Sequence, residues 1–294
     1  MPETGRDQLD VCIVSWRTRE LLRRCLRSVV GRPEAAEVIV VDNASGDGTV
    51  EMVRGEFPGV SLIANDSNLG FAAGSNQAIR ASSAPFVLLL NPDTEVRAGA
   101  LAALLEVFAE EPQVGAAAPQ LLLPSGAVQR SCRSLPEPAA LFFDALGLSR
   151  LFPGSPTLGR YRMTHWDHNT RREVAQPMAS ALALRRAALD EVGLLDEDFP
   201  LYFNDVDLCH RLRQAGWRIV FEPQAQVTHH HGQSTRQVRP AAILDSHRGL
   251  IRFYRKHYRG AICWLCYHLV IAGTWLTMWP RAALAWRGQR LRRR

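Results

Sequence analysis

The sequence predicts an α/β fold built on a mostly parallel sheet with helices on both of its faces. Short apolar runs rich in β-branched residues alternate with segments of helical periodicity through residues 10–115. The runs are continuously apolar, which is the pattern of strands that are covered on both faces. Hydrophobic residues make up 47% and charged residues 22% of the 294 residues, an ordinary globular composition that excludes disordered and disulfide-scaffold classes.

The first part of the chain gives the clearest elements. Strands are expected at residues 10–16, 37–42, 60–64 and 85–90, and helices at 19–30, 49–57, 76–82 and 98–111. Within 19–30, for example, Leu22, Leu26 and Val29 recur at the spacing of one helical face. Such alternation of strands and helices favours parallel pairing, because each helix returns the chain to the same end of the sheet.

The second part is less regular. Residues 119–160 are rich in Pro, Gly and Ser, and they are expected to form a long, partly irregular insertion near the substrate site. The helices expected after Pro112 lie at 139–146, 185–192, 205–215 and 241–259, and short strands are expected at 220–221 and 225–227.

Charge is divided unevenly along the chain. Residues 1–245 hold 24 Lys and Arg and all 29 acids, whereas residues 246–294 hold 11 Lys and Arg and no acid. A slightly acidic body with a basic, apolar tail indicates an anionic membrane surface as partner rather than nucleic acid. The polar start of the chain lacks the pattern of a secretory signal, so the cytosol or the cytoplasmic face of the cell membrane is the expected location.

The tail contains a long uncharged segment, residues 261–279. As a helix it would measure about 28 Å, close to the roughly 30 Å hydrocarbon core of a bilayer. Trp264, Trp275 and Trp279 lie near its ends, where interfacial aromatics belong. We favour a helix lying in the interface, held by aromatic and arginine side chains. A single transmembrane span and an ordinary core helix are the alternatives.

Polar residues follow three of the predicted strands, at the sheet edge where open α/β folds bind ligands. Asp42 ends the second strand, and its carboxylate can accept hydrogen bonds from a nucleobase imide or a ribose hydroxyl. The alternative is an ordinary capped turn before the next helix. Residues 68–76 (NLGFAAGSN) follow the third strand, and their small side chains would let the backbone approach a phosphate. A glycine-rich βα turn is again the alternative.

The fourth strand runs into Asn91-Pro92-Asp93. A carboxylate at a strand end suits Mg²⁺ or Mn²⁺, which favour one or two carboxylates together with ligand phosphates. The alternative is a type I turn with a capping aspartate. The triplet 229–231 (HHH) follows the last short strand; because adjacent residues of an extended chain alternate sides, we expect one of them to be a ligand.

Residues 196–207 place several acids among aromatic side chains. Asp205 and Asp207 cannot share one helical face, so at most one points straight into a pocket. A carboxylate beside Tyr202 and Phe203 would be partly desolvated, which raises its pKa and suits a general base. The alternative is that Asp205 caps the helix that follows.

Together these segments resemble a family 2 glycosyltransferase of the GT-A (Rossmann-like) fold, and more narrowly its bacterial rhamnosyltransferase-type members. The matching segments, in order over about residues 10–260, are VCIVSWRTRELLRRCLRSV, VIVVDNASGDGT, NLGFAAGSNQAI, LLLNPD, LYFNDVDLCHRLRQAGWRI and VTHHHGQST. The resemblance implies a glycosyltransferase domain at 1–245, with a nucleotide-binding part at about 10–115 and an acceptor part at about 116–245. The tail at 246–294 would associate with the membrane.

The resemblance also implies roles for individual residues. Asp205 would be the catalytic base, and Asp93 and His229 would hold the metal. The nucleotide-sugar would be contacted by Ser15, Asp42, Asn43, Ser45, Asp47, Asn68, Gly70, Phe71, Asn76, Asn91 and Asp93. The acceptor side would include Ala179, Ser180 and Asn204. Two departures from the family pattern are Asn91 in place of an acid and Asn204 in place of Glu, and segment 178–186 lacks a Gly expected near position 179.

The implied activity is metal-dependent, inverting transfer of a sugar in cell-envelope polysaccharide synthesis. The donor is a nucleotide-diphosphate sugar, with dTDP-rhamnose favoured and UDP- or GDP-sugars as alternatives. The acceptor is a glycan or a polyprenyl-linked glycan. A catalytically inactive nucleotide-sugar-binding protein of the same fold is the alternative, although such a protein would need none of Asp93, Asp205 and His229.

Overall fold

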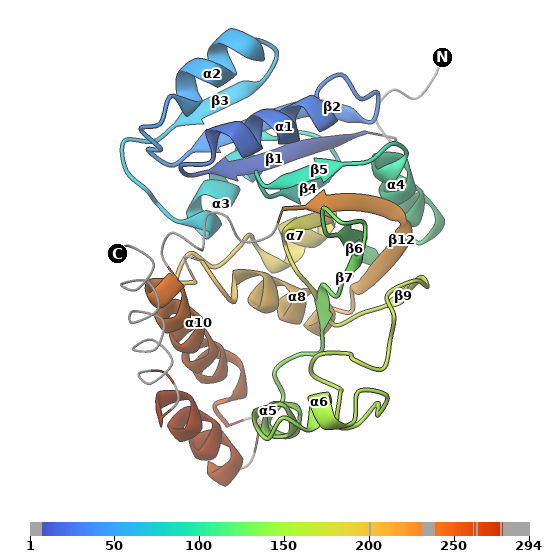
Figure 1. Ribbon diagram of the computed structural model, residues 1–294, viewed down its shortest axis with the longest axis vertical. Coiled ribbons are helices and arrows are strands. Elements are labelled where there is room, and N and C mark those ends of the chain that lie inside the picture. The colour runs from blue at the N-terminus through green and yellow to red at the C-terminus, as the bar shows by residue number, and fades with distance from the viewer. Residues whose placement is uncertain are drawn as a thin grey trace.

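The computed structural model describes residues 8–199, 201–230, 239–260, 262, 264–276 and 278 (Figure 1). A mixed sheet has the strand order β3-β2-β1-β4-β11-β6-β12-β5. Its first four strands, which are all parallel, are β3 (Ser61–Ala64), β2 (Ala35–Asp42), β1 (Leu9–Ser15) and β4 (Phe86–Leu90). This half confirms the expected parallel α/β arrangement.

The other half of the sheet reverses direction. β11 (Ala181–Arg185) lies antiparallel between β4 and β6 (Val114–Leu122). β12 (Arg218–His229) runs parallel to β6, and β5 (Thr94–Val96) pairs antiparallel with the end of β12. The remaining short strands are β7 (Val128–Gln129), β8 (Cys132–Arg133), β9 (Arg172–Glu173) and β10 (Gln176–Pro177).

Helices cover both faces, each over its own core. One core holds the apolar sides of α1 (Arg19–Val29), α2 (Thr49–Glu56) and α4 (Ala100–Glu110). The other holds those of α3 (Phe71–Ala81), α7 (Arg186–Val192) and α8 (Asn204–Gln214). Successive residues of β1 enter opposite cores, as Ile13 and Val14 do, which explains why the strand is continuously apolar.

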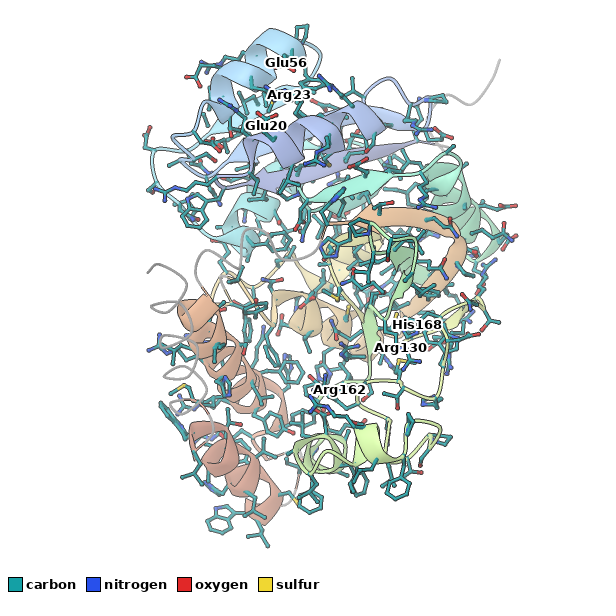
Figure 2. The ribbon with its side chains drawn as sticks, in the orientation of Figure 1. Glu20, Arg23, Glu56, Arg130, Arg162 and His168 are labelled. Carbon is teal, nitrogen blue, oxygen red and sulfur yellow. The ribbon has the colours of Figure 1, made fainter. Side chains whose placement is uncertain are left out.

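Local features of the sequence explain how two of these helices are held. Gly74 lets α3 lie close to β1, because a Cβ there would come within 2.9 Å of Val14 Cγ1. Arg23 of α1 donates through Nε to Glu56 of α2 at 2.8 Å and also pairs with Glu20 (Figure 2).

Several boundaries differ from the sequence-based expectations. The sequence did not predict β5, β6, β11 or the two-residue strands β7 to β10. β6 (VGAAAPQLL) and β11 (ALALR) are rich in alanine, which is depleted in strands. The two short strands expected at 220–221 and 225–227 are one strand, β12, whose register shifts between Glu222 and Gln226. Helix α3 begins at Phe71, earlier than expected.

The C-terminal part packs on the body through a third core. This core contains Phe199 with Phe253 and Tyr254, from the end of α10 (Arg239–Phe253) and the following π-helical turn, Tyr254–Tyr258. Leu141 of α5 (Pro138–Ala145) and Tyr267 pack against it. The short helix α6 (Leu148–Leu151) follows α5, and Arg162 holds this region by donating from Nη2 to Asp144 Oδ2 at 2.9 Å (Figure 2).

Asp207 of α8 anchors the π-helical turn. Its carboxylate is fully buried and accepts from His257 Nε2 at 2.6 Å, Lys256 Nζ at 2.8 Å and Arg211 Nε at 2.8 Å. Burial raises the pKa of this carboxyl group, but the three partners outweigh burial and hold its pKa well below the usual range. Ionised Asp207 therefore stabilises the folded protein at pH values above the pKa that this group has in the unfolded chain. This stabilisation is lost as the pH falls through the pKa of Asp207 in the folded protein.

We expect Asp207→Asn to lower the free energy of unfolding by about 3 kcal/mol, because it removes a buried carboxylate that pairs with three side chains. Urea denaturation followed by circular dichroism measures this change. Asp198→Asn is the control: Asp198 is 75% exposed and pairs with Arg252, so less than about 1 kcal/mol should be lost. An equal loss in both variants would contradict the anchoring role of Asp207.

Candidate active site

The turn after β2 is built by its own polar side chains. Asp42 is buried, and its Oδ2 accepts from the Ser45 backbone N–H at 3.0 Å. Ser45 Oγ in turn accepts from the Arg17 backbone N–H at 2.9 Å. Asn43 donates through Nδ2 to the Gly70 carbonyl at 3.0 Å, so the turns after β2 and β3 are tied together. Four of the expected nucleotide-side residues thus form one connected edge of the sheet.

The other expected nucleotide-side residues shape the surrounding loops. Asn68 Oδ1 accepts from the Gly70 N–H at 2.9 Å, and Asp47 accepts from the first turns of α1 and α2. Buried Ser15 pairs with Thr18, and Phe71 packs on the second core. Asn76 is turned away from this edge, because its amide bonds both the N–H and the carbonyl of Leu195. Contacts of these residues with a nucleotide stay predictions.

Asp93 and His229 meet at the ends of neighbouring strands. The register of β12 with β5 places His229 opposite Thr94, directly beside the turn that carries Asp93. His229 Nε2 lies 3.4 Å from Asp93 Oδ1, and both side chains are buried. His230 points to the other side, where its Nε2 lies 2.6 Å from Glu95 Oε1. His231 lies outside the described residues.

The hydrogen bonding of His229 suits a metal ligand. Its Nδ1 lies 2.9 Å from Gln129 Oε1, so one ring nitrogen is oriented by a side-chain amide while the other, Nε2, faces Asp93. An imidazole nitrogen facing a carboxylate oxygen fits a divalent cation such as Mg²⁺ or Mn²⁺. The site holds only this pair: nowhere in the described ranges, here included, is a group of three or more His, Cys, Asp or Glu arranged to hold a metal. The chain would therefore supply two ligands here and leave other positions to the phosphates of a substrate.

Asp205 lies at the start of α8, across from the segment that leads into β11. Its Oδ2 accepts from the Ala179 N–H and from Gln176 Nε2, both at 3.3 Å. Burial raises the pKa of this carboxyl group, and the Ala179 N–H opposes the rise only in part. A carboxylate with a raised pKa is a stronger base, as deprotonation of a hydroxyl requires.

The acceptor-side segment joins the two halves of this site. Ala179 bonds Asp205, and the next residue, Ser180, accepts the Asn91 N–H at 2.9 Å and lies 3.3 Å from the Asn91 amide through Oγ. Asn204 is not part of this chain of contacts, because its amide donates to the carbonyls of Phe199 and Leu201.

Sequence reasoning missed Gln129 and Gln176, which contact His229 and Asp205. They lie in two-residue strands within and after the irregular insertion, where no pattern of spacing distinguishes them from surface glutamines.

Solved structures share this architecture. A mannosyltransferase from Pyrobaculum calidifontis, in complex with GDP-Man and Mn²⁺, superposes with a TM-score of 0.59 at 19% identity, covering 96% of this chain and 74% of that one. The structure of GalNAc-T7 with UDP, GalNAc and Mn²⁺ superposes with a TM-score of 0.56 at 16% identity, covering 77% and 44%. The fold is therefore that of the GT-A glycosyltransferases.

Sequence comparison identifies the family. The model of the family described as Glycosyl transferase family 2 matches residues 10–129. The N-acetylglucosaminyl-diphospho-decaprenol L-rhamnosyltransferase of Mycobacterium tuberculosis is 32% identical over 253 residues, which cover 82% of this chain and 81% of the relative. A low-salt glycan biosynthesis hexosyltransferase of Haloferax volcanii is 25% identical over 221 residues, covering 74% and 65%. The chain belongs to glycosyltransferase family 2 and is a glycosyltransferase, as the sequence motifs predicted.

Proposed function

We propose that this protein is a metal-dependent, inverting rhamnosyltransferase that extends a polyprenyl-linked glycan for a cell-envelope polysaccharide. The observation that carries the proposal is the contact chain from the Asp93–His229 pair through Asn91, Ser180 and Ala179 to Asp205. In this proposal, the two metal ligands and the base lie on either side of one segment. The mycobacterial relative, a rhamnosyltransferase named for a lipid-linked diphosphate acceptor, supports the donor and acceptor.

The roles of the residues follow from their surroundings. Asp205 removes the proton of the acceptor hydroxyl as that oxygen attacks the anomeric carbon, and inversion follows from a single in-line displacement. Asp93 and His229 would hold Mg²⁺ or Mn²⁺, which supplies positive charge to the departing nucleoside diphosphate. Gln129 orients the His229 ring so that Nε2 faces Asp93, and Gln176 and Ala179 orient the Asp205 carboxylate.

A donor screen tests the proposed function. The full-length protein is incubated with Mg²⁺, a polyprenyl-diphosphate-linked N-acetylglucosamine acceptor and each of dTDP-rhamnose, UDP-sugars and GDP-sugars. We expect the release of nucleoside diphosphate with dTDP-rhamnose to exceed that with the other donors by at least about 10²-fold, because a site built for hydrogen bonds discriminates strongly. Higher turnover with a UDP- or GDP-sugar would overturn the donor assignment. Nucleotide binding without any turnover would indicate a binding protein instead.

We further propose that the tail attaches the protein to the cytoplasmic face of the membrane. Within the helix at 264–276, the exposed positions are 264, 265, 268, 269, 272, 275 and 276, which fall on one face. That face carries no charge, and Trp264 is 74%, Leu269 61% and Leu276 76% exposed. The opposite face packs on the third core through Tyr267, Val270 and Ile271. An uncharged, solvent-facing helix surface of this kind is typical of proteins that lie in a lipid interface.

In the parts of the chain that the structure describes, no helix is both long enough and apolar enough to cross a membrane. Some residues of the uncharged segment, Trp279 among them, lie outside the described residues.

A further inference from the structure

A cavity opens between the π-helical turn and the C-terminal helix, apart from the Asp93–His229 and Asp205 site. Its volume is about 500 Å³, and its walls include Arg255 and Arg259 on one side and Trp264, Tyr267 and His268 on the other. None of these residues takes part in the contacts of the catalytic site. The cavity therefore needs an explanation of its own.

The two arginines differ from the cations beside them. Lys256 pairs with Asp196 and Asp207, and Arg252 pairs with Asp198. Arg255 and Arg259 are both exposed, and neither has an acidic partner in the described part of the chain. Two like charges one helical turn apart repel each other, so an anion between them would be stabilising. Guanidinium groups bind phosphate through paired N–H donors.

The opposite wall is aromatic. The Trp264 and His268 rings lie 4.4 Å apart and the Tyr267 and His268 rings 5.1 Å apart, measured between centroids. Trp and Tyr rings are amphipathic, and at a membrane they lie at the level of the headgroups. The cavity thus combines cations with the side chains that mark the polar edge of a bilayer.

The apolar surface around the cavity extends beyond the C-terminal helix. Apart from Val30 and Leu69, every exposed large hydrophobic side chain in the described residues lies on that helix or near α5 and α6. The second group comprises Phe142, Leu146, Leu151 and Phe152. Figure 1 shows α5, α6 and the C-terminal helix at one end of the molecule, opposite β3 and α2. Leu141 of α5 shares the third core with Tyr267, so the two apolar groups flank one packed unit.

We propose that this cavity is a binding site for the phosphate headgroup of an anionic phospholipid. Arg255 and Arg259 hold the phosphate, while the exposed faces of the C-terminal helix and of α5–α6 rest on the apolar layer beneath it. This inference rests on the proposed membrane attachment, and it identifies an anionic phospholipid as the molecule that the attached tail binds. Positive charge without counter-charge, beside an uncharged apolar face, favours an anionic lipid over a protein partner.

The test is co-flotation of the full-length protein with vesicles of phosphatidylcholine alone, or of phosphatidylcholine and phosphatidylglycerol in equal parts. We expect the wild-type protein to bind the anionic vesicles more strongly. The double variant Arg255→Gln/Arg259→Gln should bind them about 30-fold more weakly, because each basic residue near an anionic surface contributes about fivefold. Its binding to phosphatidylcholine vesicles should change little, since the apolar faces are intact.

A matched control distinguishes the loss of a specific headgroup site from a general loss of positive charge. Arg24→Gln/Arg54→Gln removes the same charge from α1 and α2, where both arginines are exposed and have no acidic partner in the described residues. We expect this control to lose less than about threefold in binding, and an equal loss in both double variants would overturn the headgroup site. Absence of binding to either vesicle would instead overturn the membrane attachment on which it rests.

A second measurement distinguishes the bilayer lipid from the diphosphate of the acceptor. Transfer is assayed without vesicles, using an acceptor whose prenyl chain is short enough to dissolve in water. We expect Arg255→Gln/Arg259→Gln to leave the acceptor KM within about twofold of the wild-type value. A KM raised tenfold or more would assign the cavity to the acceptor and overturn the headgroup assignment.

Discussion

Replacing Asp205 by Asn is expected to lower kcat by about 10²–10⁴-fold, the usual contribution of a general base. The amide keeps the shape of the carboxylate but cannot accept the proton of the acceptor hydroxyl. The amide oxygen can still accept from the Ala179 N–H and the Gln176 amide, and only the bond from the adjacent Val206 N–H to the other oxygen is lost, so the fold should survive. Transfer is measured as nucleoside diphosphate released with donor and acceptor at saturation, and donor binding is measured separately by calorimetry.

The control for this variant is Asp190→Asn, which removes an exposed acid from α7 and should leave kcat within about twofold. The pH profile gives a second readout. Asp205 must be ionised to act, and its pKa is raised by burial, so kcat/KM should fall as the pH drops through a value above that of an ordinary aspartate. Near-normal transfer by a folded Asp205→Asn variant would exclude the assignment.

The parts of the fold that could be predicted are those in which local sequence and global burial agree. β1 and β2 are continuous β-branched runs because each is covered by helices on both sides, and that burial is visible in their composition. β6 and β11 are equally buried, but alanine fills them where neighbouring elements lie close. β11 and β6 form strands because they pair with β4 and β12, respectively. Such long-range pairing cannot be predicted from the local sequence pattern.

The same distinction applies to the site. Asp42 ends β2 and Asp93 follows β4, so the parallel topology alone brings them to one edge of the sheet. Asp205 lies at the start of α8, and its contact with Ala179 brings it to the segment before β11. Gln129 depends on the path of the irregular insertion, and its contact with His229 spans 100 residues of sequence. Asn76 matched the motif, but its amide is taken up by Leu195. A motif fixes where a residue lies in the chain, whereas the direction of its side chain depends on distant partners.

The tail shows what composition leaves undecided. The segment at 261–279 is uncharged, a composition from which we favour an interfacial helix and which leaves a core helix and a span as alternatives. The structure separates its two faces: Val270 and Ile271 pack on the third core, while Trp264 and Leu265 remain exposed. One face of the helix is thus accounted for by packing, and the other has no covering among the described residues.

We expect transfer to depend on a divalent cation held by Asp93 and His229. Addition of EDTA should abolish nucleoside diphosphate release, and an excess of Mg²⁺ or Mn²⁺ should restore it. Asp93→Ala and His229→Ala should each lower kcat by about 10²–10³-fold, since each removes a ligand of the cation that would neutralise the leaving diphosphate. Calorimetric titration of Mn²⁺ in the presence of nucleoside diphosphate should show weakened binding in the same two variants.

The neighbouring histidine provides the matched control for the metal site. His230 is adjacent in sequence, but its side chain pairs with Glu95 on the other side of β12. His230→Ala should therefore keep Mn²⁺ binding and transfer within a few fold of the wild-type protein, and thermal melting should show that all three variants are folded. Full transfer in the presence of chelator would contradict the metal site and place stabilisation of the leaving diphosphate on side chains alone. Equal losses in His229→Ala and His230→Ala would show that the effect is structural, because only His229 faces the Asp93 carboxylate.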